Sequence, residues 1–173
     1  LNKFKSIKAK DAIKHPNWKM GKKISVDSST MMNKVLEVLE AYRLFPFSKE
    51  KYEIIIHPQS LVHAIVFLKN GQTKLLYHDA DMKIPIANAL YNNKVDINEF
   101  IPKRFIPIKK HLNLKFEPVD KKRFPIVTLI SQNYYDCSGG IILNACNEVL
   151  VNEFLKNKIA FNSIFPYLKR VFK

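Results

Sequence analysis

Residues 27–45 carry the clearest helical pattern in the chain and read DSSTMMNKVLEVLEAYRLF. The first three are residue types that commonly cap a helix N-terminus, and Pro46 would end the run. Its large apolar residues recur at helical spacing on one side: Met31, Val35, Val38, Leu39 and Tyr42. We therefore predict a helix over about residues 30–45, with the hydroxyls of Ser28 and Ser29 at its N-terminus.

The other side of this predicted helix is polar. At about 100° per residue, one sector of roughly 120° holds five side chains: Thr30, Asn33, Lys34, Glu37 and Glu40. A solvated surface face explains such a stripe, and so does a ligand site. For a site, a helix N-terminus attracts anions, and Asn33 and Lys34 could donate to the same phosphate oxygens as the seryl cap. Glu37, one turn further along, could hold a hard divalent cation.

A basic loop broken by Pro16 and Gly21 precedes the helix, and its residues 15–21 read HPNWKMG. Trp18 has little apolar sequence around it, so it could cover a ligand as part of a lid or anchor the loop on its own domain. His15 alone indicates little, because an isolated histidine is more often structural than catalytic. We also predict a short helix near residues 8–14 and a short strand over residues 24–26.

Strand and turn signals follow. Asn70-Gly71, the strongest short hairpin signal, separates two β-rich runs at residues 61–69 and 72–78. We further predict strands over residues 52–56 and 114–116 and helices over residues 84–91, 126–135, 141–156 and 163–172, with breaks at Gly139-Gly140 and Asn157.

These elements predict an α+β fold, in which a β-sheet has flanking helices and a flexible loop and is followed by a small C-terminal helical domain. We place the first part at residues 1–100, a linker at residues 101–112 and the helical domain at residues 113–173.

The composition favours a globular protein and argues against several classes. The chain has 173 residues, of which 47% are hydrophobic and 25% charged, which argues against disorder. No run approaches the roughly 20 apolar residues of a membrane helix. Two cysteines are too few for a disulfide framework, so we expect a cytoplasmic location. The net charge of +14 attracts polyanions, but the basic residues are mostly Lys rather than the Arg that specific base readers use. We therefore expect neither a membrane nor a nucleic-acid partner.

At this point a family resemblance is clear. Residues 15–34, HPNWKMGKKISVDSSTMMNK, closely resemble the active-site loop and helix of the 1-deoxy-D-xylulose 5-phosphate reductoisomerase family. The likeness continues in order along the chain through IHPQS (56–60), His63, DMKIPI (81–86), RFP (123–125) and LNACNE (143–148). The resemblance implies a rearrangement of 1-deoxy-D-xylulose 5-phosphate followed by hydride transfer from NADPH, which gives 2-C-methyl-D-erythritol 4-phosphate in non-mevalonate isoprenoid biosynthesis. It also implies a Mg²⁺ or Mn²⁺ ion, which would polarise the substrate carbonyl, and a homodimer of the full-length enzyme.

The resemblance also implies roles for single residues. Ser28, Asn33 and Lys34 match substrate-binding residues, and Glu37 matches a carboxylate ligand of the metal ion. His15 and Trp18 match residues of the flap that closes over the substrate. The cofactor contacts that it implies are Met20, Gly21 and Met82. His63 matches a histidine important for activity, although a partly buried strand histidine is an equal alternative.

Two departures from the family pattern matter. The chain has no G-x-G-x-x-G fingerprint and no counterpart of the family's Asp-Ser-Glu metal element, so we expect the NADPH-binding domain to be absent and the chain to be inactive alone. Val35 stands where the family usually has Gly. It lies on the apolar side of the predicted helix, so we expect repacking rather than lost chemistry.

Two other classes remain open from the residues. A lysine-rich nucleic-acid-binding module would bind duplexes with steep salt dependence. An inactive gene remnant would fold poorly, because its strands would lose partners and leave exposed edges.

Overall fold

The computed structural model describes residues 7–13, 20–45, 47–101, 113–131 and 137–171. The chain divides into two compact units, which are described separately. The first unit combines Leu1–Ile54 with Val119–Lys173, and the second is Ile55–Pro118. The predicted division at residues 100 and 113 stays a prediction.

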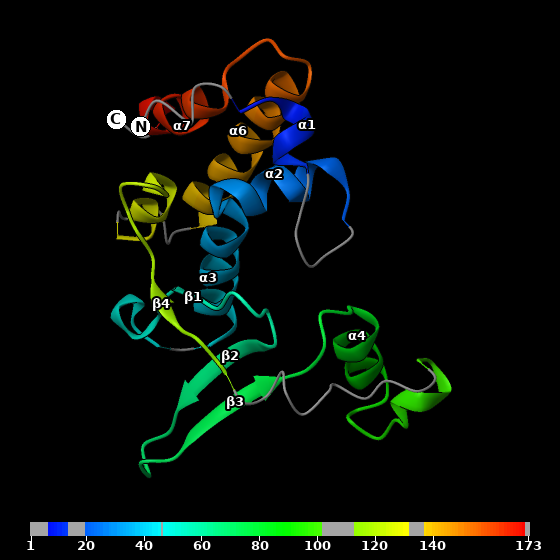
Figure 1. The fold of residues 1–173 in the computed structure, drawn as a ribbon. Coiled ribbons are helices and arrows are strands. Elements are labelled where there is room, and N and C mark those ends of the chain that lie inside the picture. Colours follow the sequence, from blue (N-terminus) through cyan, green and yellow to red (C-terminus); the bar gives the residue numbers. More distant parts are fainter. Residues whose placement is uncertain (1–6, 14–19, 46, 102–112, 132–136, 172–173) are drawn as a thin grey trace. The chain divides into compact units, whose positions relative to one another are not determined.

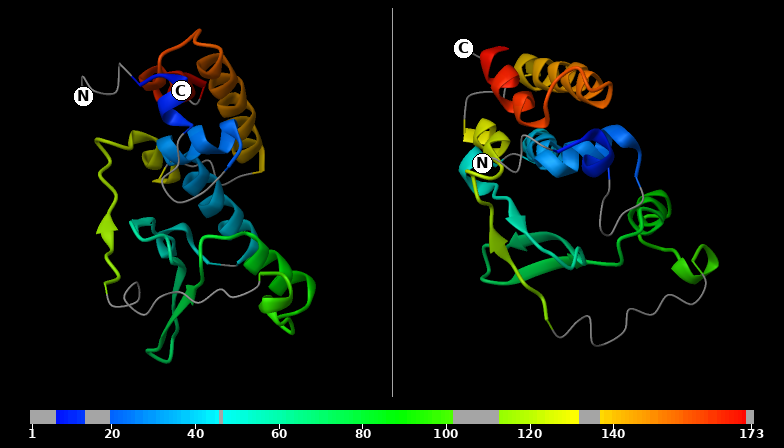
Figure 2. Two further views of the ribbon diagram at one scale, coloured as in Figure 1. Left: turned by 45° about the vertical axis from the view of Figure 1, so that its right-hand side comes forward. Right: turned by 45° about the horizontal axis from the view of Figure 1, so that its top comes forward.

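The first unit is helical (Figure 1). Its elements are α1 (Ala9–Ala12), α2 (Lys22–Thr30), α3 (Met32–Leu44), the 3-10 helix η2 (Lys49–Lys51), η4 (Pro125–Ser131), α6 (Cys137–Leu155), η5 (Phe161–Ser163) and α7 (Ile164–Val171). Helix α6 packs against α2, α3 and α7, and α3 also packs against η4. Two further views show α6 and α7 side by side (Figure 2).

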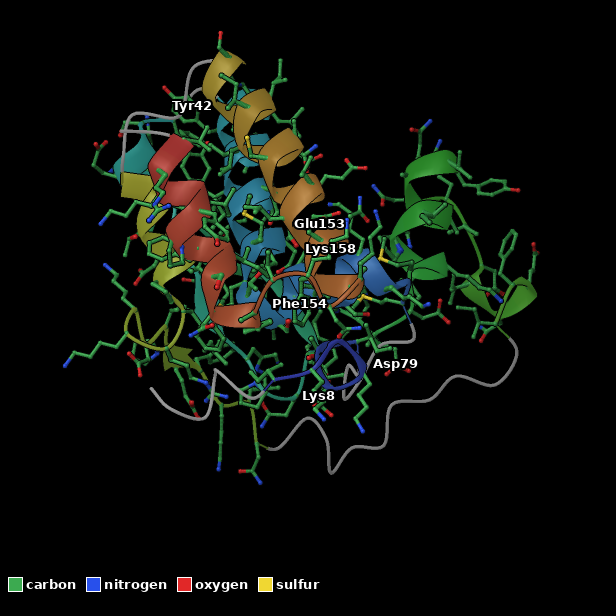
Figure 3. The ribbon with its side chains drawn as sticks, turned by 90° about the horizontal axis from the view of Figure 1, so that it is seen from above. Lys8, Tyr42, Asp79, Glu153, Phe154 and Lys158 are labelled. Carbon is green, nitrogen blue, oxygen red and sulfur yellow. The ribbon has the colours of Figure 1, made fainter. Side chains whose placement is uncertain are left out.

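Apolar side chains from these helices form the core of the first unit. The fully buried ones are Val26, Met32, Val35, Ile126, Leu129, Leu143, Val151, Ile164 and Leu168. Phe154, labelled near the C-terminal end of α6 in Figure 3, is 2% exposed and contacts Phe161 edge to face at 5.5 Å between ring centroids. Each such side chain stabilises the fold by about 1.5–3 kcal/mol through removal of apolar surface from water.

The predicted strand over residues 24–26 is wrong, because these residues belong to helix α2. Ile-Ser-Val is a β-favouring triplet, but local propensity is weaker than tertiary packing. Within α2, Ser25, Val26 and Asp27 are all buried, and the helix packs against α3 and α6. Burial of this face therefore selects the helix.

The second unit holds two small antiparallel sheets. Strands β2 (Val62–Phe67) and β3 (Thr73–Tyr77) form the predicted hairpin, with Phe67 opposite Thr73 and a bulge between Val62 and Ala64. Gly71 has φ 85°, a left-handed conformation that glycine adopts without strain, which confirms the Asn-Gly turn. Strands β1 (Ile55–Ile56) and β4 (Glu117–Pro118) pair with Ile55 opposite Pro118.

Helical elements complete the second unit and most of them agree with the sequence. Helix α4 (Lys83–Leu90) confirms the helix predicted over residues 84–91, and η3 (Ile97–Glu99) follows it. Strand β4 lies just after the predicted residues 114–116. The unit's buried apolar side chains are Leu61, Ala87 and Ile101.

Two predictions about the C-terminal helices need correction. Gly139-Gly140 does not break the chain but lies inside α6, and residues 125–131 form a 3-10 rather than an α-helix. The break at Asn157 is confirmed, since α6 ends at Leu155 and Asn157, two residues later, adopts φ 59°. The elements together give the predicted α+β fold with a helical C-terminal part. None of the helices in the described ranges combines the length and apolar character that crossing a membrane requires.

Candidate functional site

The polar stripe lies at a corner between two helices rather than at the start of one. Helix α2 ends at Thr30 and α3 begins at Met32, and Met31 between them has φ 66°. The Met31 amide donates to the Ser28 carbonyl oxygen over 3.1 Å, and the Lys34 amide donates to the Met31 carbonyl oxygen over 3.2 Å. Ser28 thus lies on the last turn of α2, and Asn33 and Lys34 lie on the first turn of α3.

The predicted seryl cap is therefore wrong. Ser28 and Ser29 are inside α2, where the Ser29 hydroxyl donates to the Val26 carbonyl oxygen over 2.7 Å. The residue that meets the start of α3 is Thr30, whose Oγ1 accepts from the Met32 amide over 3.3 Å. Because α2 continues to Thr30, the hydroxyl of Thr30, rather than that of Ser28 or Ser29, accepts from the Met32 amide at the start of α3.

Three of the predicted side chains meet on one face of α3. Glu37 accepts from Lys34 Nζ at Oε2 over 2.7 Å and from Asn33 Nδ2 at Oε1 over 3.4 Å. The side chains of Lys34 and Glu37 are 45% and 52% exposed, so their pairing contributes less than about 1 kcal/mol to stability. The face thus presents two donors and a carboxylate to solvent, and an anionic ligand would compete with Glu37 for the Lys34 ammonium.

The sequence alone does not predict a buried polar cluster that joins α2 and α6. Asp27 is 1% exposed, and its carboxylate accepts from Lys23 Nζ over 2.8 Å and from Asn147 Nδ2 over 2.8 Å. The sequence indicates Asp27 as a helix-capping residue and contains Asn147 only within a family motif. No local pattern could connect them, because the pair bridges α2 and α6.

The cofactor candidates of the first unit lie at the start of α2. Gly21 is its exposed N-cap residue, with φ −64° and ψ 161°, and its carbonyl oxygen accepts from the buried Ser25 hydroxyl over 2.9 Å. Met20 is half-buried. His15 and Trp18, the flap candidates, lie outside the described residues.

His63 and Met82 belong to the second unit. His63 lies on β2 and is exposed, rather than the partly buried strand histidine considered as an alternative. Its ring stacks on that of His78 with centroids 3.8 Å apart, and its Nε2 lies 3.1 Å from the His78 carbonyl oxygen. Because a carbonyl oxygen only accepts, Nε2 is the nitrogen that carries the proton in this contact. Met82 is 55% exposed at the N-terminus of α4.

Next to this histidine pair, burial raises the pKa of the Tyr77 phenol above its usual value, and the Asp79 carboxylate adds to the rise. Tyr77 pairs with Val62 across the hairpin, one position before His63. A phenol is neutral at physiological pH in any case, so the rise in pKa only moves its ionisation further above that pH.

The described residues do not form a metal site by themselves. Among them, no group of three or more His, Cys, Asp or Glu side chains comes together. Glu37 offers one exposed carboxylate, whereas Mg²⁺ usually takes one or two carboxylates together with water or phosphate oxygens. A bound ion would therefore need ligands from outside the described residues.

Comparisons with known proteins agree over the whole chain. Residues 1–45 match the family described as 1-deoxy-D-xylulose 5-phosphate reductoisomerase C-terminal domain, and residues 78–173 match the DXP reductoisomerase C-terminal domain. The chain is 46% identical over 172 residues to the reductoisomerase of Pelagibacter ubique, covering 99% of this chain and 44% of that protein. It is 41% identical over 165 residues to the Campylobacter jejuni enzyme, covering 95% of this chain and 44% of that protein.

Solved structures give the same result. The reductoisomerase of Zymomonas mobilis in complex with NADPH superposes with a TM-score of 0.84 at 33% identity, covering 98% of this chain and 43% of that one. A reductoisomerase in complex with NADPH, fosmidomycin and magnesium superposes with a TM-score of 0.88 at 34% identity, covering 97% of this chain and 41% of that one. The chain thus spans less than half the length of the relatives it matches. Within that span, it belongs to the 1-deoxy-D-xylulose 5-phosphate reductoisomerase family.

Proposed function

We propose that this chain is the C-terminal part of an enzyme that converts 1-deoxy-D-xylulose 5-phosphate to 2-C-methyl-D-erythritol 4-phosphate with NADPH and a divalent cation, Mg²⁺ or Mn²⁺. The observation that carries the proposal is the convergence of Asn33, Lys34 and Glu37 on one face of α3. Family membership, and relatives solved with NADPH and magnesium, support the reaction class.

In this proposal the α2–α3 corner binds the phosphorylated substrate. Ser28 and Asn33 donate to the phosphate, and the Lys34 ammonium supplies the positive charge. Lys34 leaves Glu37 when the anion binds, since a phosphate dianion attracts an ammonium more strongly than one carboxylate does. Glu37 would then be free to contribute a single ligand to the divalent cation, which would polarise the substrate carbonyl when bound.

The remaining assignments follow the family match and are part of the same proposal. His15 and Trp18 form the flap that excludes water from the reacting substrate. Met20, Gly21 and Met82 contact the nicotinamide cofactor, and His63, with its proton held on Nε2 by the His78 carbonyl, acts near the substrate. The complete enzyme is a cytoplasmic homodimer, and its dinucleotide-binding part is supplied by sequence outside this chain.

A phosphate titration tests the site in the chain itself. Inorganic phosphate, and separately the substrate, are added while the backbone amide resonances of Asn33 and Lys34 are followed by NMR. We expect saturable shifts at these amides and at Ser28. Lys34→Ala should weaken binding by roughly 10-fold or more, because it removes a charge-assisted hydrogen bond.

Lys156 offers a matched control. It pairs with Glu153 at the same i,i+3 spacing and is 62% exposed, but it directly follows α6 and belongs to neither α2 nor α3. Lys156→Ala removes the same charge and should leave phosphate affinity within about twofold of wild type. Equal losses in the two variants would mean that only net charge matters, and they would overturn the assignment of the site.

A turnover assay tests the wider function. The chain alone should not oxidise NADPH in the presence of substrate and Mg²⁺. A rate that appears when the upstream part of the Pelagibacter ubique relative is supplied as a separate polypeptide, and that Glu37→Ala abolishes, would support the proposal. Turnover by the chain alone above the Glu37→Ala control would show that the expected inactivity is wrong.

A further inference from the structure

A buried polar pair joins the helix that ends at the proposed site to the helix that supports it. Asp27 in α2 is 1% exposed and Asn147 in α6 is 0% exposed. Nδ2 of Asn147 donates to Oδ1 of Asp27 over 2.8 Å, and Lys23 Nζ lies 2.8 Å from Oδ2. A buried carboxylate is costly unless charge and hydrogen bonds compensate it, so Asp27 depends on both partners.

The position of Asp27 gives this pair a consequence for the site. Asp27 directly precedes Ser28 on the last turn of α2, and the chain turns into α3 at Met31. The φ of 66° at Met31 is a left-handed conformation that an L-residue adopts only at a cost. Because the backbone preference of Met31 does not favour this corner, contacts with other segments of the chain must stabilise it.

Helix α6 contacts both arms of the corner (Figures 1 and 2). On α2 it contacts Asp27 through Asn147. On α3 it lies within ordinary van der Waals range, since a Cβ on Gly140 would be 3.9 Å from Cδ1 of Leu39. Oδ1 of Asn147 is buried and has no hydrogen-bond partner within the described part of the chain. The Asn147 side chain thus donates to Asp27 through Nδ2, while its own acceptor oxygen is left unsatisfied by the described residues.

We propose that Asn147 is a positioning residue for the α2–α3 corner. By binding the Asp27 carboxylate, it fixes the angle between the last turn of α2, which carries Ser28, and the first turn of α3, which carries Asn33 and Lys34. The importance of that angle for phosphate binding rests on the proposed function. The fixing of the corner does not rest on it.

Amide hydrogen exchange in the intact chain tests the proposal. The reporters are the amides of Met31, Lys34 and Val35, which donate to carbonyl oxygens across the corner. In Asn147→Leu, we expect these amides to exchange at least roughly 10-fold faster, because a hydrogen bond to a buried charged group is lost. Amides of α7 lie outside the corner. Their exchange rates should change only as far as the change in global stability requires.

Two neighbours on the same face of α6 provide matched controls. Leu143 and Val151 lie one turn before and one turn after Asn147, and both are 0% exposed. Leu143→Ala and Val151→Ala should lower global stability without selectively accelerating exchange at the corner. If they accelerate it as much as Asn147→Leu does, Asn147 is only one more packing residue and the proposal is wrong.

Reversing the pair separates positioning from packing. In the double variant Asp27→Asn with Asn147→Asp, the amide on α2 can donate to the carboxylate on α6. We expect corner exchange to return to within about threefold of wild type, whereas Asn147→Asp alone should be the most perturbed variant because two carboxylates face each other. Absence of rescue would overturn the proposal, and so would global unfolding of both Asn147→Leu and Asp27→Asn.

A phosphate titration of the same variants distinguishes the two proposals. Weaker binding in Asn147→Leu and recovery in the double variant would connect the corner to the ligand. If wild type shows no phosphate response at Asn33 or Lys34, the proposed site is wrong, and the exchange data still decide whether Asn147 fixes the corner.

Discussion

Substitution of Val35 by Gly should cost the chain about 4 kcal/mol of stability while leaving the polar face of α3 intact. Val35 is 1% exposed on α3, a helix that packs against η4, α2 and α6. Removal of the whole side chain forfeits its burial and leaves a cavity that neighbours fill only in part, which together cost about 3 kcal/mol. Glycine inside a helix costs about 1 kcal/mol more, because its backbone gains more conformational entropy on unfolding than that of any other residue.

Urea denaturation followed by circular dichroism measures the effect, and Val35→Ala provides the comparison. The alanine variant keeps the Cβ and is a good helix former, so it should lose only about 2–3 kcal/mol; the further loss in Val35→Gly combines the missing Cβ with the helical cost of glycine. Phosphate affinity should change less than about threefold in either variant, because Val35 faces away from Asn33 and Lys34. A loss below about 1 kcal/mol for Val35→Gly would refute the packing described for α3, and lost phosphate binding in a folded variant would refute the separation of the two faces.

Other expectations concern single residues. Gly71→Ala places a Cβ on a residue with φ 85° and should destabilise the hairpin by about 1–2 kcal/mol in thermal denaturation, whereas Gln72→Ala should be nearly neutral. The hydrogen bond from Lys158 holds the pKa of Glu153 below its usual value, so its contribution to stability is present above the unfolded-state pKa and is lost as the pH falls through the folded-state pKa. Carboxyl NMR titration of Lys158→Ala should show the Glu153 midpoint moving upward. Asn157→Gly should raise the melting temperature slightly, because glycine accepts φ 59° with less strain.

Elements with strong local signals could be predicted from the sequence. The Asn70-Gly71 turn, with β-rich runs on both sides, gave the right hairpin, because positive φ and alternating strands are encoded within a dozen residues. The predicted stripe was correct in part, since Asn33, Lys34 and Glu37 do meet on one face of α3, whereas Thr30 belongs to α2. Helical periodicity alone places side chains three and four positions apart on the same side.

What could not be predicted depends on contacts between distant segments. The triplet Ile24–Val26 favours a strand in isolation, but burial of one face of α2 against α3 and α6 makes it helical. Asp27 looks like a capping residue until Asn147, 120 positions later, is seen to donate to it. The corner at Met31 has no sequence signal, since neither Gly nor Asn marks the left-handed residue.

The pairing of β1 with β4 brings the two ends of the second unit together. Ile55 and Pro118 are direct partners in one antiparallel ladder, so the second unit begins and ends at adjacent points. A segment with this arrangement behaves as an insertion in a loop of its host. A short turn that joins Ile54 directly to Val119 should therefore leave a continuous helical miniprotein, and the excised segment could be exchanged between relatives as a cassette.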